Sequence, residues 1–148
     1  MKIYIAYGSA LEQTTALRLQ ALGAVQGLNL YEPPAHTRTD NVLDPHSSLQ
    51  LREADFVLGI LGLEFSPVCR EELNLAKNSA KKILVLASPG LASYVQETFP
   101  GKVYILNSNS SHPQNIITFL RQQIKDDAMK TALIGLGIIA AGLMIFSQ

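Results

Sequence analysis

The sequence predicts an α/β fold with a five-stranded parallel sheet in flavodoxin-like order and helices on both faces. Short apolar runs rich in β-branched and aromatic residues alternate along the chain with segments of helical periodicity. Glycine or proline residues end most of these segments. One run, Asp55–Leu61, is almost continuously apolar, which is typical of a strand buried on both faces of a parallel sheet. This alternation predicts right-handed crossovers, with helices that cover both faces of the sheet.

The composition indicates a globular domain and disfavours several classes of function. The chain has 148 residues, of which 47% are apolar and 16% are charged, so it is long enough for a real core. The 12 basic and 12 acidic side chains balance, and no basic cluster is interleaved with aromatic residues, which disfavours nucleic-acid binding. A single cysteine excludes an internal disulfide framework. The three histidines, His36, His46 and His112, lack metal-ligand spacing, so they are expected in loops, and neither a metal nor a cofactor is expected.

The first strand and the first helix are predicted from residues 2–23. Lys2–Tyr7 predicts a strand that stops at Gly8. Ser9 and Glu12 have the spacing of a capping box, so a helix is expected to begin at once and to end at Gly23. The residues expected to carry the apolar face of this helix are Leu11, Ala16, Leu19 and Leu22.

The turn between this strand and this helix consists of Tyr7, Gly8, Ser9 and Ala10. It places backbone N–H groups and a helix N-terminus at the carboxyl end of a strand, which suits a phosphate group. The segment has neither a G-x-G-x-x-G motif nor a Walker lysine, so a turn that binds no ligand is the alternative.

Four further strands and their helices follow at regular intervals. In chain order, they are a strand at Leu28–Tyr31, a long polar loop at Glu32–Asp44, a helix at Ser47–Ala54, the strand at Asp55–Leu61, a helix from Pro67, a strand at Lys82–Ala87, a helix at Leu91–Phe99, a strand at Lys102–Leu106 and a helix from Pro113. Ligands of such sheets bind beyond the carboxyl ends of the strands. The loops expected to meet at that edge are Gly8–Ala10, Glu32–Asp44 and Gly62–Ser66.

The helix that begins at Pro67 carries one carboxylate within its apolar face. Ser66 is a suitable N-cap, and the helix is expected to run to about Ser79. At about 100° per residue, Glu72 shares a face with Val68, Cys69, Leu73, Leu75, Ala76, Ser79 and Ala80. One interpretation is that Glu72 lies at the edge of this face and reaches water or a basic partner. The other is that it faces a cleft, where its surroundings raise its pKa for acid–base or ion-stabilising chemistry.

The C-terminal segment Thr131–Ser147 contains no charged residue and is near the lower limit for crossing a bilayer of about 30 Å. Arg121, Lys125 and Lys130 precede it and nothing basic follows, so the positive-inside rule predicts a single-pass tail anchor with a cytoplasmic N-terminal domain. The alternative is an apolar terminal helix packed on its own domain.

The predicted organisation is therefore an α/β domain at residues 1–127 and a transmembrane helix at residues 128–148. Small residues in the tail would allow such helices to pack together, which predicts a homo-oligomer. They are Gly135, Gly137, Ala141 and Gly142.

Two segments of the chain resemble the TIR (Toll/interleukin-1 receptor) family over about residues 1–125. KIYIAYGSA, followed by a helix, is similar to the first box of that family. FSPVCREEL resembles its S-x-x-C-x-x-E-L segment, with matches at Ser66, Cys69, Glu72 and Leu73. The resemblance implies a flavodoxin-like fold. In catalytic, especially prokaryotic, members it implies that a glutamate matching Glu72 is needed to cleave the bond between nicotinamide and ribose in NAD⁺, where a carboxylate can stabilise an oxocarbenium-like centre.

The resemblance also implies a substrate pocket around this glutamate. Cys69 would line the pocket, while Val68 replaces the tryptophan of the family, so stacking on a base would fall to Phe65, Tyr7 or Tyr31. Arg38, in the loop that corresponds to the mobile loop of the family, is expected to contact a phosphate. The full set of expected substrate-binding residues is Tyr7, Gly8, Ser9, Ala10, Arg38, Phe65, Ser66 and Cys69.

Three hypotheses for the function follow. The first is a membrane-anchored NAD⁺ glycohydrolase or cyclase with Glu72 as catalytic residue, in bacterial defence or cell-death signalling, with NAD⁺ as substrate. The second is a non-catalytic TIR-like signalling or assembly module. The third is an enzyme similar to the nucleoside 2-deoxyribosyltransferases, which also use a glutamate against an anomeric carbon and which Ala54-Asp55 and Glu72–Ala76 match loosely.

Overall fold

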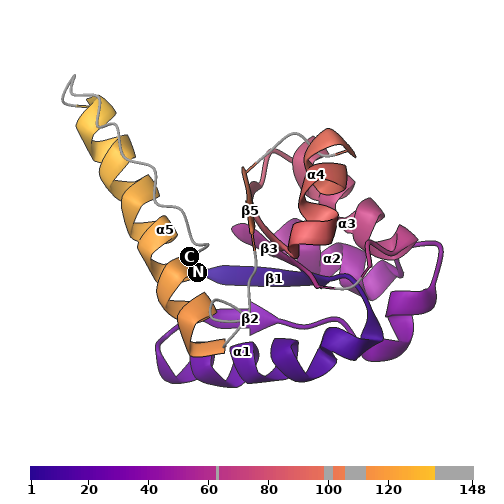
Figure 1. Cartoon of the computed structure of the whole chain (residues 1–148). Helices are drawn as coiled ribbons and strands as arrows, with labels where there is room; N and C mark the ends of the chain where they lie inside the picture. Colours follow the sequence, from indigo (N-terminus) through magenta and orange to yellow (C-terminus); the bar gives the residue numbers. More distant parts are fainter. Residues whose placement is uncertain (63, 99–101, 106–112, 136–148) are drawn as a thin grey trace.

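The computed structural model describes residues 1–62, 64–98, 102–105 and 113–135, and it shows a parallel sheet with helices on both faces (Figure 1). The sheet has the order β2-β1-β3-β4-β5, which is the order of flavodoxin-like proteins. Its strands are β1 (Lys2–Tyr7), β2 (Asn29–Tyr31), β3 (Phe56–Leu61), β4 (Lys82–Ala87) and β5 (Lys102–Ile105). The prediction of an α/β fold with a parallel sheet is confirmed.

The helices form two layers around this sheet. They are η1 (Ala10–Glu12), α1 (Gln13–Val25), η2 (Ala35–Thr39), α2 (Pro45–Glu53), α3 (Pro67–Asn78), α4 (Pro89–Thr98) and α5 (Pro113–Gly135). Side chains of α1 and α5 pack on one face of the sheet, and those of α2, α3 and α4 pack on the other. All neighbouring strands pair in parallel, so each loop that follows a strand opens at the same edge of the sheet.

The period-2 alternation of β1 decides which residues face each layer. Ile3, Ile5 and Tyr7 belong to the core cluster with α1 and α5, whereas Tyr4 and Ala6 belong to the cluster with α2, α3 and α4. β3 is buried at every position, as expected for a central strand of a parallel sheet.

The start of the first helix differs from the prediction. Ser9 forms no side-chain hydrogen bond with the backbone, and a 3₁₀ turn precedes α1. The Glu12 carboxylate reaches a second loop, because its Oε2 accepts a hydrogen bond from the backbone N–H of Gly62 at 3.1 Å. Leu11 is 76% exposed and so contributes nothing to the core. The helix also continues past Gly23 to Val25.

The C-terminal helix α5 buries Ile116, Ile117 and Leu120 against the sheet and continues to Gly135. It crosses the expected boundary at residue 127 within one helix. Most of the predicted span, residues 136–147, lies outside the described residues. Within the described part of the chain, no helix is both long and apolar enough to cross a membrane.

Candidate active site

Glu72 lies in the middle of α3 and has no solvent-exposed surface. The Ser66 hydroxyl accepts a hydrogen bond from the Cys69 N–H at 3.4 Å, so the predicted N-cap of α3 is confirmed. Cys69 and Leu73 are buried on the same face of the helix. The position of Glu72 within an apolar face is therefore also confirmed. It does not reach water, but it does reach a basic partner, as the first interpretation allowed.

A buried arginine from η2 balances the charge of Glu72. The Arg38 guanidinium donates from Nη1 to Oε1 of Glu72 at 2.6 Å and from Nη2 to Oε2 at 3.0 Å, and neither side chain is exposed. This bidentate geometry is the strongest form of an arginine–carboxylate pair. Arg38 was expected in the site as a contact for a phosphate; in the structure its anionic partner is Glu72.

Four further contacts fix the position of the Arg38 side chain. Its Nη1 also donates to the backbone carbonyl of Tyr7 at 3.2 Å, and its Nη2 and Nε donate to the Thr37 hydroxyl at 3.0 and 3.2 Å. The guanidinium carbon lies 4.8 Å from the centre of the Tyr7 ring, within the range of a cation–π interaction. Arg38 therefore connects η2 to both β1 and α3.

Tyr4, on β1, supplies a second donor to the carboxylate. Its hydroxyl donates to Oε2 of Glu72, and its side chain is fully buried. Burial raises the pKa of Tyr4 far above its usual value and the negative charge of Glu72 adds to this shift, so the hydroxyl stays a neutral donor. Tyr4 is not among the site residues expected from the sequence. Its signal was the period-2 alternation of β1, which places it on the face covered by α3.

The burial of the pair shifts the ionisation of both partners. Burial raises the pKa of the Glu72 carboxyl above its usual value, while Arg38 and the Tyr4 hydroxyl act in the opposite direction. Burial disfavours the charge of Arg38, but Glu72 raises the pKa of the guanidinium above its usual value. A carboxylate of raised pKa with two oriented donors is suited to acid–base or nucleophilic chemistry.

The turn after β1 lies beside this pair, and the structure gives its residues different roles. The Tyr7 hydroxyl donates to the Pro33 carbonyl at 2.5 Å, which attaches β1 to the segment before η2. At Gly8, a Cβ would lie 2.0 Å from the carbonyl oxygen of Glu64, so only glycine allows the loops after β1 and β3 to approach this closely. Ser9 is buried, and Ala10 is exposed.

Glu12 is a second carboxylate at this edge that sequence analysis assigned only to helix capping. It accepts from the Gly62 N–H and from the Ser9 hydroxyl, the latter at 3.3 Å. It therefore joins the loops that follow β1 and β3. These two strands are neighbours at the point where the chain reverses direction across the sheet, which is where ligands of such folds bind.

The aromatic residues expected to stack on a base have protein partners. Phe65 is half-buried, with the Arg70 guanidinium 5.0 Å from its ring centre and the Tyr94 ring 6.2 Å away in an edge-on arrangement. The Tyr31 ring lies 5.5 Å from that of Tyr4, across the pairing of β1 with β2. Tyr31 thus borders the buried site, whereas Phe65 is turned toward α4.

Cys69 and the histidines supply no further reactive group. Burial raises the pKa of the Cys69 thiol well above its usual value and the charge of Glu72 adds to this shift, so Cys69 acts as an apolar wall of the site. His36 lies in η2 and His46 in α2, and His112 is outside the described residues. Within the described segments, no three His, Cys, Asp or Glu residues are grouped as metal ligands.

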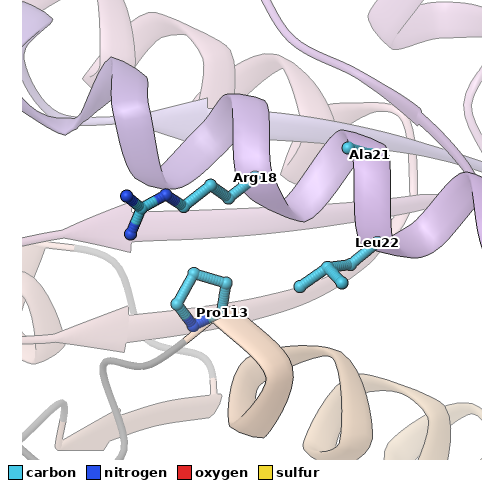
Figure 2. A pocket seen from close by; sticks show the side chains of 4 residues that line it. All are labelled: Arg18, Ala21, Leu22 and Pro113. Carbon is cyan, nitrogen blue, oxygen red and sulfur yellow. The ribbon is translucent and has the colours of Figure 1, made fainter.

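A separate hollow lies on the opposite face of the sheet, between α1 and the start of α5. Figure 2 shows Arg18, Ala21 and Leu22 of α1 around it, with Pro113 at the start of α5. Its volume is about 400 Å³. Because Glu72 and Arg38 belong to the other side of the sheet, this hollow is no part of the candidate site.

Comparisons with known proteins show the fold of the chain but no family. No family model and no curated protein sequence match it. The solution structure of BlsM matches with a TM-score of 0.58 and 19% identity over 82% of this chain and 90% of that chain. The CMP N-glycosidase BcmB of Clostridium botulinum matches with a TM-score of 0.51 and 15% identity over 82% of this chain and 99% of that chain.

A third structure, CapF with the inhibitor 3-isopropenyl-tropolone, matches with a TM-score of 0.50 and 20% identity. That match covers 71% of this chain but only 29% of the CapF chain, so this chain spans less than a third of that protein. Identities this low establish a shared fold alone. Membership of the TIR family stays a prediction.

Proposed function

We propose that this chain cleaves the N-glycosidic bond of a nucleoside or nucleotide, with Glu72 as the residue that engages the ribosyl carbon. The observation that carries the proposal is the fully buried Glu72 carboxylate, oriented by Tyr4 and Arg38 beside the carboxyl edge of a parallel sheet. The fold shared with a protein described as a CMP N-glycosidase supports the same class of bond. It favours the hypothesis of a nucleoside-processing enzyme over an enzyme restricted to NAD⁺.

The chemistry requires a carboxylate for a specific reason. When the bond between C1′ and the base nitrogen breaks, the electron pair leaves with the base and positive charge develops on the ribosyl carbon. Glu72 would stabilise this charge or form a transient bond to C1′. Water then supplies a hydroxyl group to C1′ and a proton to the base, which balances the hydrolysis. A second base in place of water would give transfer.

The neighbours of Glu72 would serve the same step. The Tyr4 hydroxyl would hold one carboxylate oxygen in place and leave the other to face the sugar. The buried side chains of Cys69 and Leu73 would exclude water, which strengthens the attraction between the carboxylate and the developing cation. The Arg38 pair occupies both oxygens of Glu72, so the carboxylate must be released from Arg38 before it can react.

The proposal is tested by incubating the full chain with a panel of N-glycosides. The panel contains ribonucleosides, 2′-deoxyribonucleosides, their 5′-monophosphates and NAD⁺, and free base is measured by chromatography and mass spectrometry. A parallel series with an added second base distinguishes hydrolysis from transfer. Release of base from any member supports the proposal. If no member releases base, the proposal is wrong, and the Arg38–Glu72 pair serves the fold alone.

A further inference from the structure

We propose that Arg38 exchanges partners during the reaction: a phosphate group of the substrate takes the guanidinium from Glu72, so that the chain acts on nucleotides in preference to neutral nucleosides. This inference rests on the proposed function. Three features of the site support it: the charge balance of the buried pair, the geometry of the guanidinium and the way η2 is attached.

Release of Glu72 would leave the positive charge of Arg38 behind in the protein interior. Arg38 is 2% exposed, and among the described residues its one salt bridge is with Glu72; its other hydrogen-bond partners, Tyr7 and Thr37, are uncharged. When Glu72 turns to a ribosyl centre, Arg38 becomes a buried cation that has lost its salt-bridge partner. Such a charge is costly in a protein interior. A neutral nucleoside offers no compensation, whereas a nucleotide brings its own anion.

The Arg38 guanidinium has a geometry that suits a phosphate as well as a carboxylate. In the pair with Glu72, Nη1 and Nη2 of Arg38 each bond one carboxylate oxygen, at 2.6 and 3.0 Å. Two oxygens of a phosphate can accept from the same two nitrogen atoms, because the guanidinium fork fits carboxylate and phosphate alike. The incoming phosphate would also repel the Glu72 carboxylate. The same event would thus satisfy Arg38 and free the reacting group.

Exchange of partners would require η2 to move together with Arg38. η2 has five residues, and only Thr37 and Arg38 of these are buried. Thr37 bonds locally to the Pro34 carbonyl at 2.6 Å, so Arg38 is the residue that connects η2 to α3. The next residues are exposed up to Val42, and the Leu43 N–H bonds to Glu71 of α3 at 2.8 Å. Movement of η2 would therefore expose little apolar surface.

The experiment compares matched substrates on matched variants. Base release is measured as kcat/KM for a nucleoside 5′-monophosphate and for the nucleoside with the same base, with wild type, Arg38→Gln, Arg38→Lys and Arg52→Gln. Arg52 is an exposed arginine of α2 and serves as the control. NAD⁺ is tested beside them, because the phosphates of its diphosphate could also accept hydrogen bonds from the Arg38 guanidinium.

We expect the wild type and Arg52→Gln to prefer the monophosphate, or NAD⁺, at least tenfold over the nucleoside. Arg38→Gln should lose this preference, because its rate with the phosphorylated substrate should fall by a larger factor than its rate with the nucleoside. Arg38→Lys should keep part of it.

Two results would overturn the inference and leave the proposed function intact. They are equal wild-type rates on the matched pair, or an Arg38→Gln variant in which both rates fall by the same factor. Absence of base release from every substrate would instead overturn the proposed function and this inference with it.

Discussion

At the scale of single residues, the site combines an ion pair and a neutral donor around one carboxylate. Arg38 and Tyr4 both donate to Glu72, and all three side chains are buried. Buried ion pairs contribute little net stability, because desolvation of two charges offsets their attraction. Removal of one partner is different, since it leaves the other charge buried and uncompensated.

Replacement of one partner and replacement of both should therefore have different effects on the free energy of unfolding. Glu72→Gln is expected to lower the free energy of unfolding by about 3–5 kcal/mol, because the Arg38 charge stays buried. The double substitution Arg38→Gln/Glu72→Gln should recover most of this loss. Urea unfolding followed by circular dichroism measures both. A double variant that is less stable than Glu72→Gln would show that the pair itself stabilises the fold.

At the scale of secondary-structure elements, two helices of the site begin with side-chain N-caps. The Asp44 carboxylate accepts from the Ser47 N–H at 3.0 Å at the start of α2, and Ser66 has the same role in α3. Burial opposes the charge of Asp44, but hydrogen bonds from Ser47 hold the pKa of that carboxyl below its usual value. These caps fix the ends of the loop that carries η2 and of the loop after β3.

The cap of α2 should give a pH-dependent contribution to stability. Asp44→Ala is expected to cost about 0.5–2 kcal/mol at neutral pH. Because the pKa of Asp44 is lowered in the folded state, its contribution is present above the usual value of 3.8 and is lost as the pH falls through the lowered value.

Urea unfolding of wild type and Asp44→Ala at several pH values tests this. Asp40→Ala, an exposed carboxylate of the same loop, is the control and should change little. A stability difference between wild type and Asp44→Ala that persists unchanged at the lowest pH would contradict the assigned role.

Patterns that act within one element were predictable from the sequence, whereas pairings between elements were not. The Ser66 cap and the place of Glu72 on the buried face of α3 follow from local spacing. The Arg38–Glu72 pair joins residues 34 apart in sequence, and no periodicity relates a loop to a helix face. Ser9 and Glu12 show the converse: their spacing fits a capping box, but the Gly62 amide competes for the carboxylate.

At the scale of the whole molecule, the strand order brings the reacting residues together. β1 lies between β2 and β3, so the loops after these three strands meet at one edge. Gly8 permits the closest approach, since the Glu64 carbonyl occupies the place of a Cβ. The loops after β1 and β3 are thereby packed against each other beside Arg38.

Gly8→Ala is expected to force these loops apart and to cost about 1–3 kcal/mol of stability. Gly90→Ala is the matched control, because Gly90 lies in α4 and a Cβ there meets nothing within 4 Å. Alanine at Gly90 should be neutral or stabilising. Thermal unfolding of the two variants gives the comparison, and equal melting temperatures would show that the contact between the loops is unimportant.

The most direct test of the central claim is the rate of base release by Glu72→Asp beside Glu71→Asp, measured with the best substrate of the panel. Both variants keep their charge, so the pair with Arg38 can persist, and Glu71 is the exposed neighbour of Glu72 on the same helix. Aspartate is shorter than glutamate by one methylene group, so its carboxylate would lie farther from the reacting carbon. This displacement should lower the rate of base release about 10²-fold, because the rate depends steeply on the position of the reacting groups. Glu71→Asp should keep the wild-type rate. A folded Glu72→Asp protein that released base as fast as the wild type would contradict the assignment of Glu72 as the reacting carboxylate.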